Sequence, residues 1–155
     1  MELTTAGALM KFAMRLENQA LEFYEETAGG TSSQDGKQAF SDLAGANRKS
    51  AALLERLYKD NTFSDMDVGV NEPVAGLDPG SYSTEVNLGS TSHYTELLEL
   101  ALELEKKAGK FYLDCIGQIN SQSRSVLKRL DKLAKEKAER QSRLNSLLAV
   151  AASSG

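Results

Sequence analysis

The chain has 155 residues, of which 41% are hydrophobic, and this suits a single domain with a core of its own. A formal net charge of −4 and a pI of about 5.1 argue against general affinity for nucleic acid. No apolar run approaches the roughly 20 residues of a membrane span, and the N-terminus lacks the basic start and apolar stretch of a signal peptide. We therefore expect one cytoplasmic domain over residues 1–155 without membrane contact.

Four helices are predicted in chain order, over about residues 5–28, 34–60, 93–116 and 123–150. The first is expected to stop at the breaker pair Gly29-Gly30. Between about 61 and 90 the helical periodicity vanishes, and this stretch holds both prolines and four glycines. A structureless connection of that length is uncommon inside a compact domain. We expect it to be a crossover that takes the chain from one end of a bundle to the other.

Each predicted helix carries an apolar seam, at steps of three and four residues, that polar residues interrupt near its middle. The interrupting residues are, in chain order, Glu17, Asn47, Ser50, Glu105, Lys137 and Arg140. Burying a charge is costly unless that charge is paired. Two carboxylates and two cations at one level therefore predict a polar centre in which the charges pair to zero.

The chain also contains an internal repeat. The pattern Leu-Glu-x-x-Ala-x-x-Phe-Tyr occurs at 16–24 and again at 104–112, an offset of 88 residues. The second and fourth helices correspond through a shared Leu-Ala pair at 43–44 and 133–134. The protein is thus expected to consist of two helical hairpins that form a bundle with pseudo-twofold symmetry.

Two hairpins, a long crossover and Glu-x-x-Ala-x-x-Phe-Tyr in the first and third helices resemble the ferritin-like superfamily, rubrerythrin branch. The resemblance implies an all-α, antiparallel four-helix bundle of two hairpins joined by the crossover at about 61–90. It also implies a di-iron site, for which each hairpin supplies one Glu from its first helix and Glu-x-x-His from its second. Glu17 and Glu105 match the first-helix ligands. The remaining four ligand positions do not match, because they hold Asn47, Ser50, Lys137 and Arg140.

Lys137 and Arg140 are cations without a lone pair at neutral pH, so they would repel iron rather than bind it. Placed opposite Glu17 and Glu105, they would take over the charge-balancing role of the metal. We therefore expect no metal and no cofactor, with Asn47 and Ser50 meeting the remaining hydrogen-bonding needs. The alternative is that iron binds through Glu17, Glu105 and oxygen donors that the pattern does not identify.

Two plainer interpretations of these residues stay open at the sequence level. Glu17 and Glu105 could be solvated, with the true seam one step away on Leu16 and Leu104. Lys137 and Arg140 could extend their charged ends to the bundle edge.

Other residues with chemical potential are expected to be structural. Tyr24 and Tyr112 correspond to ring positions near the metal centre of the family that the chain resembles, and they are expected to be core residues with satisfied hydroxyls. Cys115 lies on the third seam and is expected to be a small buried side chain. His93 stands 12 residues before Glu105, or about 18 Å along a helix, so it is expected at the surface rather than in a central site.

Two classes of function remain. The first is a structural or interaction protein, a ferritin-like bundle that has lost its di-iron centre and acts through its surface. The second is a divergent iron-binding oxidoreductase or iron-handling protein. The fourth helix is basic and could contact RNA or an acidic partner, but pairing with the acidic first and third helices, in the same bundle or across a dimer, is the simpler explanation. A homodimer is expected from the resemblance, a further protein partner is left open, and no nucleic acid is expected.

Overall fold

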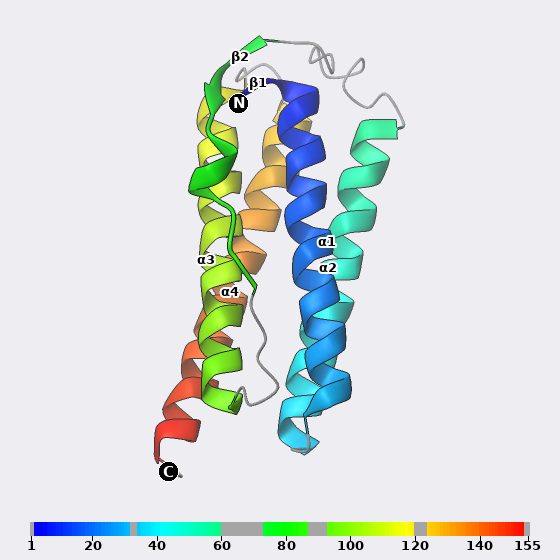
Figure 1. The fold of residues 1–155 in the computed structure, drawn as a ribbon. Helices are drawn as coiled ribbons and strands as arrows, with labels where there is room; N and C mark the ends of the chain where they lie inside the picture. Colours follow the sequence, from blue (N-terminus) through cyan, green and yellow to red (C-terminus); the bar gives the residue numbers. More distant parts are fainter. Residues whose placement is uncertain (1, 32–33, 60–72, 87–92, 120–123, 154–155) are drawn as a thin grey trace.

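The computed structural model describes residues 2–31, 34–59, 73–86, 93–119 and 124–153 (Figure 1). It contains four long helices, and their bounds are Ala6–Gly30 for α1, Gln34–Lys59 for α2, Tyr94–Gln118 for α3 and Arg124–Ser153 for α4. The predicted all-α architecture, an antiparallel bundle of two hairpins joined by a crossover, is confirmed. No helix in the described part of the chain is long and apolar enough to cross a membrane.

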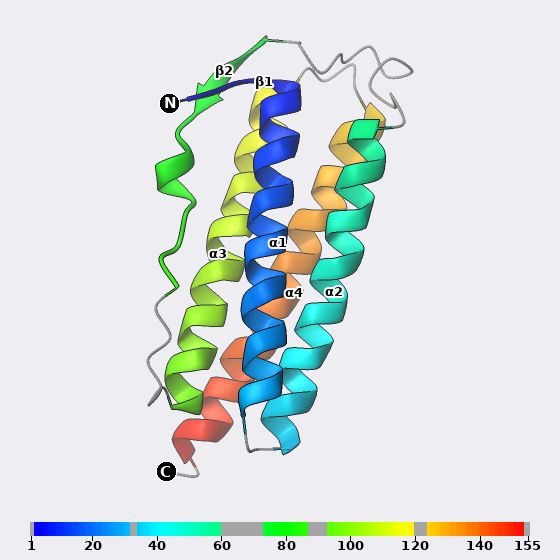
Figure 2. The same cartoon turned by 45° about the vertical axis from the view of Figure 1, so that its right-hand side comes forward.

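The helices pack in two hairpins that face each other (Figures 1 and 2). α1 packs along α2, and α3 packs along α4, while α1 also contacts α3 and α2 contacts α4. In this arrangement α1 and α4 lie diagonally across the bundle. A side chain from α4 that reaches α1 therefore passes through the centre of the molecule.

The helix ends differ from the prediction by a few residues. α1 begins after Thr5, whose side chain accepts a hydrogen bond from the backbone N–H of Ala8 at 3.1 Å. It includes Gly29 and ends at Gly30, and the C-cap residue Thr31 has an extended backbone. The helix therefore ends at the glycine pair, two residues later than predicted, because glycine weakens a helix without forbidding helical backbone angles. The expected caps of α2 and α3 at 32–33 and 90–92 lie outside the described residues.

The crossover contains regular structure that the sequence pattern did not predict. Strand β1, Leu3–Thr5, pairs antiparallel with strand β2, Pro73–Leu77, and a short 3-10 helix follows at Pro79–Ser81. From there the chain runs along α3 (Figures 1 and 2). The expectation of a wholly structureless connection is wrong for the described residues 73–86, because pairing with the N-terminus satisfies backbone groups that a loop would leave to water.

Side chains of the helices hold this part of the crossover in place. Gln118 binds the backbone of Gly76 twice, through N–H to Oε1 at 2.7 Å and through Nε2 to the carbonyl at 2.9 Å. The hydroxyl of Tyr82 donates to Asp114 Oδ2 at 2.6 Å, and Gln19 donates to the carbonyl of Thr84 at 2.9 Å. The crossover thus closes the α1–α3 side of the bundle.

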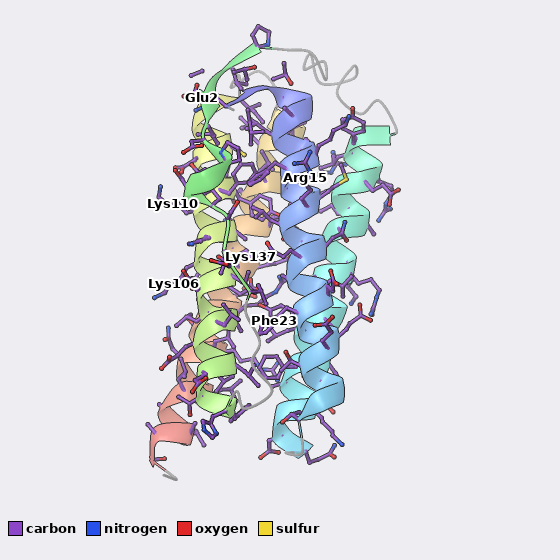
Figure 3. All side chains as sticks on the ribbon, viewed as in Figure 1. Glu2, Arg15, Phe23, Lys106, Lys110 and Lys137 are labelled. Atoms are coloured by element: carbon purple, nitrogen blue, oxygen red, sulfur yellow. The ribbon has the colours of Figure 1, made fainter. Side chains whose placement is uncertain are left out.

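The apolar core forms two clusters of buried side chains. One lies toward the β1–β2 end and includes Leu9, Phe111 and Leu130, and the other includes Phe23 and Phe40. Figure 3 shows Lys137 at about mid-height of the bundle, above Phe23. Polar side chains separate the two clusters, and this region is the candidate site.

Candidate functional site

The six polar residues that interrupt the helical seams meet in one layer at the centre of the bundle. We define the polar layer as Glu17 of α1, Asn47 and Ser50 of α2, Glu105 of α3, and Lys137 and Arg140 of α4. The two glutamates have 0% exposure, and Lys137 has 1%. The interpretation of Glu17 and Glu105 as solvated residues is therefore wrong, and so is the placement of the Lys137 ammonium at the bundle edge.

Lys137 joins the two hairpins electrostatically. Its Nζ lies 2.9 Å from Glu17 Oε1 and 3.2 Å from Glu105 Oε2, and it donates a hydrogen bond to Glu17 Oε2 at 3.1 Å. Three carboxylate oxygens thus surround one ammonium group, which can donate three hydrogen bonds. Because Lys137 and both glutamates are buried, the charge of Lys137 is screened by solvent and salt far less than that of a surface lysine.

Arg140 makes longer contacts than Lys137. Its guanidinium lies 3.7 Å from Glu105 Oε2 and 3.7 Å from Glu136 Oε2, and it donates to Asn47 Oδ1 and Ser50 Oγ at 3.4 Å each. The side chain is 11% exposed, so it reaches the edge of the layer. The interpretation of an extended arginine is thus correct in part: Arg140 touches solvent, but it still faces the buried Glu105.

The two glutamates differ in how well they are satisfied. Glu17 Oε2 accepts a hydrogen bond from Asn47 Nδ2 at 2.9 Å in addition to that from Lys137. Glu105 Oε2, in contrast, is buried and accepts no hydrogen bond in the described part of the chain, although the Lys137 ammonium is 3.2 Å away. The 3.2 Å separation is therefore an ion-pair contact without hydrogen-bond alignment, and the Glu105 side of the layer is the less saturated one.

Tyr24 and Tyr112 complete the layer by crosswise hydrogen bonds. The hydroxyl of Tyr24 on α1 donates to Glu105 Oε1 at 2.8 Å, and that of Tyr112 on α3 donates to Glu17 Oε1 at 2.7 Å. The tyrosines and the glutamates are each separated by the same 88 residues as the sequence repeat. Burial, reinforced by the facing carboxylates, raises the pKa of both phenols well above the ordinary value. Both therefore remain neutral donors.

Asn47 and Ser50 adapt the α2 side of the layer to the cations of α4. Asn47 donates to Glu17 and accepts from Arg140, so its amide links the two charged groups. Ser50 donates to the carbonyl of Ala46 at 3.2 Å and accepts from Arg140. As expected from the sequence, both residues satisfy hydrogen-bonding needs of the charged side chains.

The residues of the polar layer do not fit the iron site that the resemblance implies. Such a site needs several carboxylate and imidazole donors. Across the described ranges, no group of three or more His, Cys, Asp and Glu side chains is arranged to hold a metal ion. Moreover, the Lys137 ammonium contacts both glutamates, so a metal ion shared by them would meet a positive charge at close range.

Two positions next to the layer were not identified from the sequence. A Cβ atom added to Gly109 of α3 would lie 3.3 Å from Lys137 Cβ and 3.2 Å from Gln141 Nε2, so glycine permits close approach of α3 and α4 there. Gln141 in turn donates to the carbonyl of Glu105 at 3.4 Å. The internal repeat contains a sequence signal for Gly109, because the corresponding residue of the first half is the much larger Leu21.

The remaining sequence candidates lie outside the layer. His93 is exposed, as expected, and is the N-cap residue of α3 without a side-chain capping bond. Cys115 is buried in the apolar cluster near the β1–β2 end, and burial raises the pKa of its thiol. Neither residue is placed for catalysis at the polar layer.

The basic residues of α4 pair with several partners. Lys137 and Arg140 contact glutamates of α1 and α3, as expected for a basic helix in an acidic bundle. Arg143, however, bonds Asp42 of α2 at 3.0 Å, and Lys135 pairs with Asp131 on its own helix. Within one chain, the expectation that α4 pairs with α1 and α3 is thus wrong for these two cations, because the exposed face of α4 points away from both helices.

Comparison with known proteins identifies the class of fold. The structure resembles the crystal structure of a Thermotoga maritima protein, a candidate ferritin-like diiron-carboxylate protein, with a TM-score of 0.76 over 96% of this chain and 97% of the other at 18% identity. It also resembles a hypothetical protein from Pyrococcus furiosus, with a TM-score of 0.68 over 92% and 87% at 22% identity. The sequence matches no protein-family model and no curated protein. The fold is a ferritin-like helical bundle, and this likeness concerns the fold alone.

Proposed function

We propose that this chain is a ferritin-like bundle of the rubrerythrin type that has lost its di-iron centre and serves as a structural or interaction protein in the cytoplasm. The observation that carries the proposal is the position of Lys137, whose ammonium lies within 3.2 Å of carboxylate oxygens from both Glu17 and Glu105. Lys137 and Arg140 neutralise the two buried carboxylates, so the layer needs no external ion for charge balance.

The proposal is tested by anaerobic titration of metal-stripped protein with Fe(II), followed by desalting and iron counting. The expected result is almost no retained iron and no absorption band on exposure to oxygen. A matched positive control restores the donors that the resemblance implies, through Asn47→Glu, Ser50→His, Lys137→Glu and Arg140→His. About two irons per unmodified chain, as di-iron chemistry requires, would overturn the proposal.

The second candidate is a divergent iron-binding oxidoreductase or iron-handling protein. It is favoured by one specific comparison, since the Thermotoga maritima protein of like fold is a candidate diiron-carboxylate protein. Glu17 and Glu105 would have to bind iron after Lys137 moves out of the layer. The same titration decides between the two candidates, because only the second predicts iron that survives desalting.

For the partner, we propose a second copy of this chain bound across the outer face of α1 and α2. A groove of about 440 Å³ lies there, lined in part by Met14, Leu21 and Tyr58. Alanines at 51 and 52 stand midway between Arg48 and Glu55 on the α2 side of this groove. An antiparallel twofold axis at these alanines would pack the groove of one copy against that of the other, while Arg48 keeps its ion pair with Glu25 of its own α1.

Sedimentation of the native chain and of Ala52→Arg tests this interface. The side chain at 52 is exposed in one copy, so the substitution should leave the fold intact and place a bulky charge on the twofold axis. We expect a dimer for the native chain and a monomer for the variant. Monomeric native protein at micromolar concentration would contradict the interface without bearing on the metal-free layer.

A further inference from the structure

The polar layer gathers three carboxylate oxygens around one ammonium group. Lys137 Nζ has three carboxylate oxygens at 2.9, 3.1 and 3.2 Å, and an ammonium group carries three N–H donors. The fourth oxygen, Glu105 Oε1, is held by Tyr24, and Tyr112 fixes Glu17 Oε1 from the opposite helix. The acceptors are thus oriented by groups other than Lys137.

The Lys137 ammonium is covalently attached to α4, and this attachment restricts the hydrogen bonds that it can donate to the carboxylates. Glu105 Oε2 accepts no hydrogen bond within the described residues, although Nζ is 3.2 Å away. The side chain enters from α4, where Gly109 of α3 holds the two backbones close together. An ammonium ion without this covalent connection could turn one N–H toward Glu105 Oε2.

A groove that is open to solvent lies beside the layer, on the side opposite the crossover. The groove between α2 and α4 has a volume of about 480 Å³, and Arg140 forms part of its wall. Gly45 and Ala46 of α2 line the same groove together with the longer side chains of Asp42 and Lys49. A small molecule that displaces the Arg140 side chain would come next to Glu105.

We propose that the polar layer is a binding site for a primary ammonium ion, which the chain fills with its own Lys137 side chain. The ligand class is a small primary alkylammonium rather than a metal ion, because two fixed carboxylates and the Arg140 guanidinium carry a net charge of −1, which one singly charged cation neutralises. This inference rests on the metal-free function proposed above.

The test uses the Lys137→Ala variant with propylammonium chloride, since this ion replaces the atoms that the substitution removes. We expect a saturable rise in the Tm of the variant, by about 3–6 °C when the amine is tenfold above its Kd. Propan-1-ol and sodium chloride at equal concentration should not reproduce the rise. If the variant is unfolded, the readout becomes recovery of its helical circular dichroism on addition of propylammonium but not of propan-1-ol.

Two matched variants show whether the carboxylates are responsible. Adding Glu17→Gln and Glu105→Gln to Lys137→Ala should abolish the effect of propylammonium, and Lys137→Met should show none because its side chain fills the space. Equal effects of propylammonium and sodium chloride on Lys137→Ala would overturn the inference. This failure is distinct from failure of the proposed function, which would appear as iron retained by the unmodified chain.

Discussion

Tyr24 of α1 and Glu105 of α3 form a hydrogen bond across the bundle, with 2.8 Å between the phenol oxygen and Glu105 Oε1. The corresponding hydrogen bond in the opposite direction runs from Tyr112 of α3 to Glu17 of α1, at 2.7 Å. Each hairpin thus orients the carboxylate of the other before the cations of α4 are considered. This mutual support makes the layer part of the architecture that joins the hairpins.

Replacing either tyrosine by phenylalanine should weaken the fold to a similar extent. Tyr24→Phe and Tyr112→Phe each remove one donor from a buried carboxylate, and hydrogen bonds to charged groups contribute about 1.5–3 kcal/mol. Urea denaturation measures the free energy of unfolding, with Tyr94→Phe as a control because Tyr94 is only partly buried and lies outside the polar layer. Losses below about 0.5 kcal/mol for both buried tyrosines would mean that these bonds do not stabilise the layer.

The raised pKa of the two phenols predicts a loss of stability at alkaline pH. The unfolded chain releases these protons near the ordinary tyrosine pKa of about 10, whereas the folded chain retains them, so stability is fully present below about pH 10 and declines above it. The double variant Tyr24→Phe/Tyr112→Phe should show a shallower decline. Tyr82 and Tyr94 also have raised pKa values, so part of the decline in stability with pH should remain in the double variant. If the stability of the native chain and of the double variant declined equally with pH, the buried Tyr24 and Tyr112 would not be the cause of the decline.

Removing the buried ammonium should destabilise the fold more than removing a surface charge. Lys137→Met leaves two buried carboxylates with Arg140 as their remaining cation, and breaking such a pair typically costs about 3–5 kcal/mol. Lys135→Met is the matched control, because Lys135 is exposed and pairs within its own helix.

A double-mutant cycle separates the pairing from the burial. Glu17→Gln should lower the free energy of unfolding less in the Lys137→Met background than in the unmodified chain. In that background the substitution removes a carboxylate that has already lost its cation. Chemical denaturation of the four proteins gives the coupling energy. Strict additivity would show that Lys137 and Glu17 do not interact energetically despite their 2.9 Å separation.

The thiol of Cys115 should be unreactive in the folded protein. It is buried within an apolar cluster, and burial raises its pKa, so the reactive thiolate is scarce at neutral pH. The thiol can be labelled with a reagent whose released product absorbs visible light. This reaction should be slow in buffer and complete in denaturant. Rapid labelling without denaturant would mean that the α3 segment around Cys115 opens frequently.

The membership of the polar layer could be predicted from the sequence because helical periodicity fixes which residues share a face. Glu17 and Lys137 interrupt long seams at steps of three and four, and the repeat at 88 residues places Glu105 at the level of Glu17. Their pairing followed from the cost of leaving a buried charge unpaired. The bundle and its crossover followed from the same pattern.

Other features depend on distances between elements that the sequence pattern does not contain. The crosswise pairing of Tyr24 with Glu105 requires the spacing of α1 and α3, and the central position of Lys137 against the peripheral one of Arg140 requires the rotation of α4. The β1–β2 pair joins residues about 70 positions apart through strands too short to give a periodic signal.

The measurement that tests the metal-free layer most directly is a crystal structure of the protein exposed to Fe(II) without oxygen, with anomalous data collected at the iron edge. We predict no anomalous peak between Glu17 and Glu105, and electron density for the Lys137 ammonium in contact with both carboxylates. An iron peak at that position, with the Lys137 side chain turned out of the layer, would contradict the account.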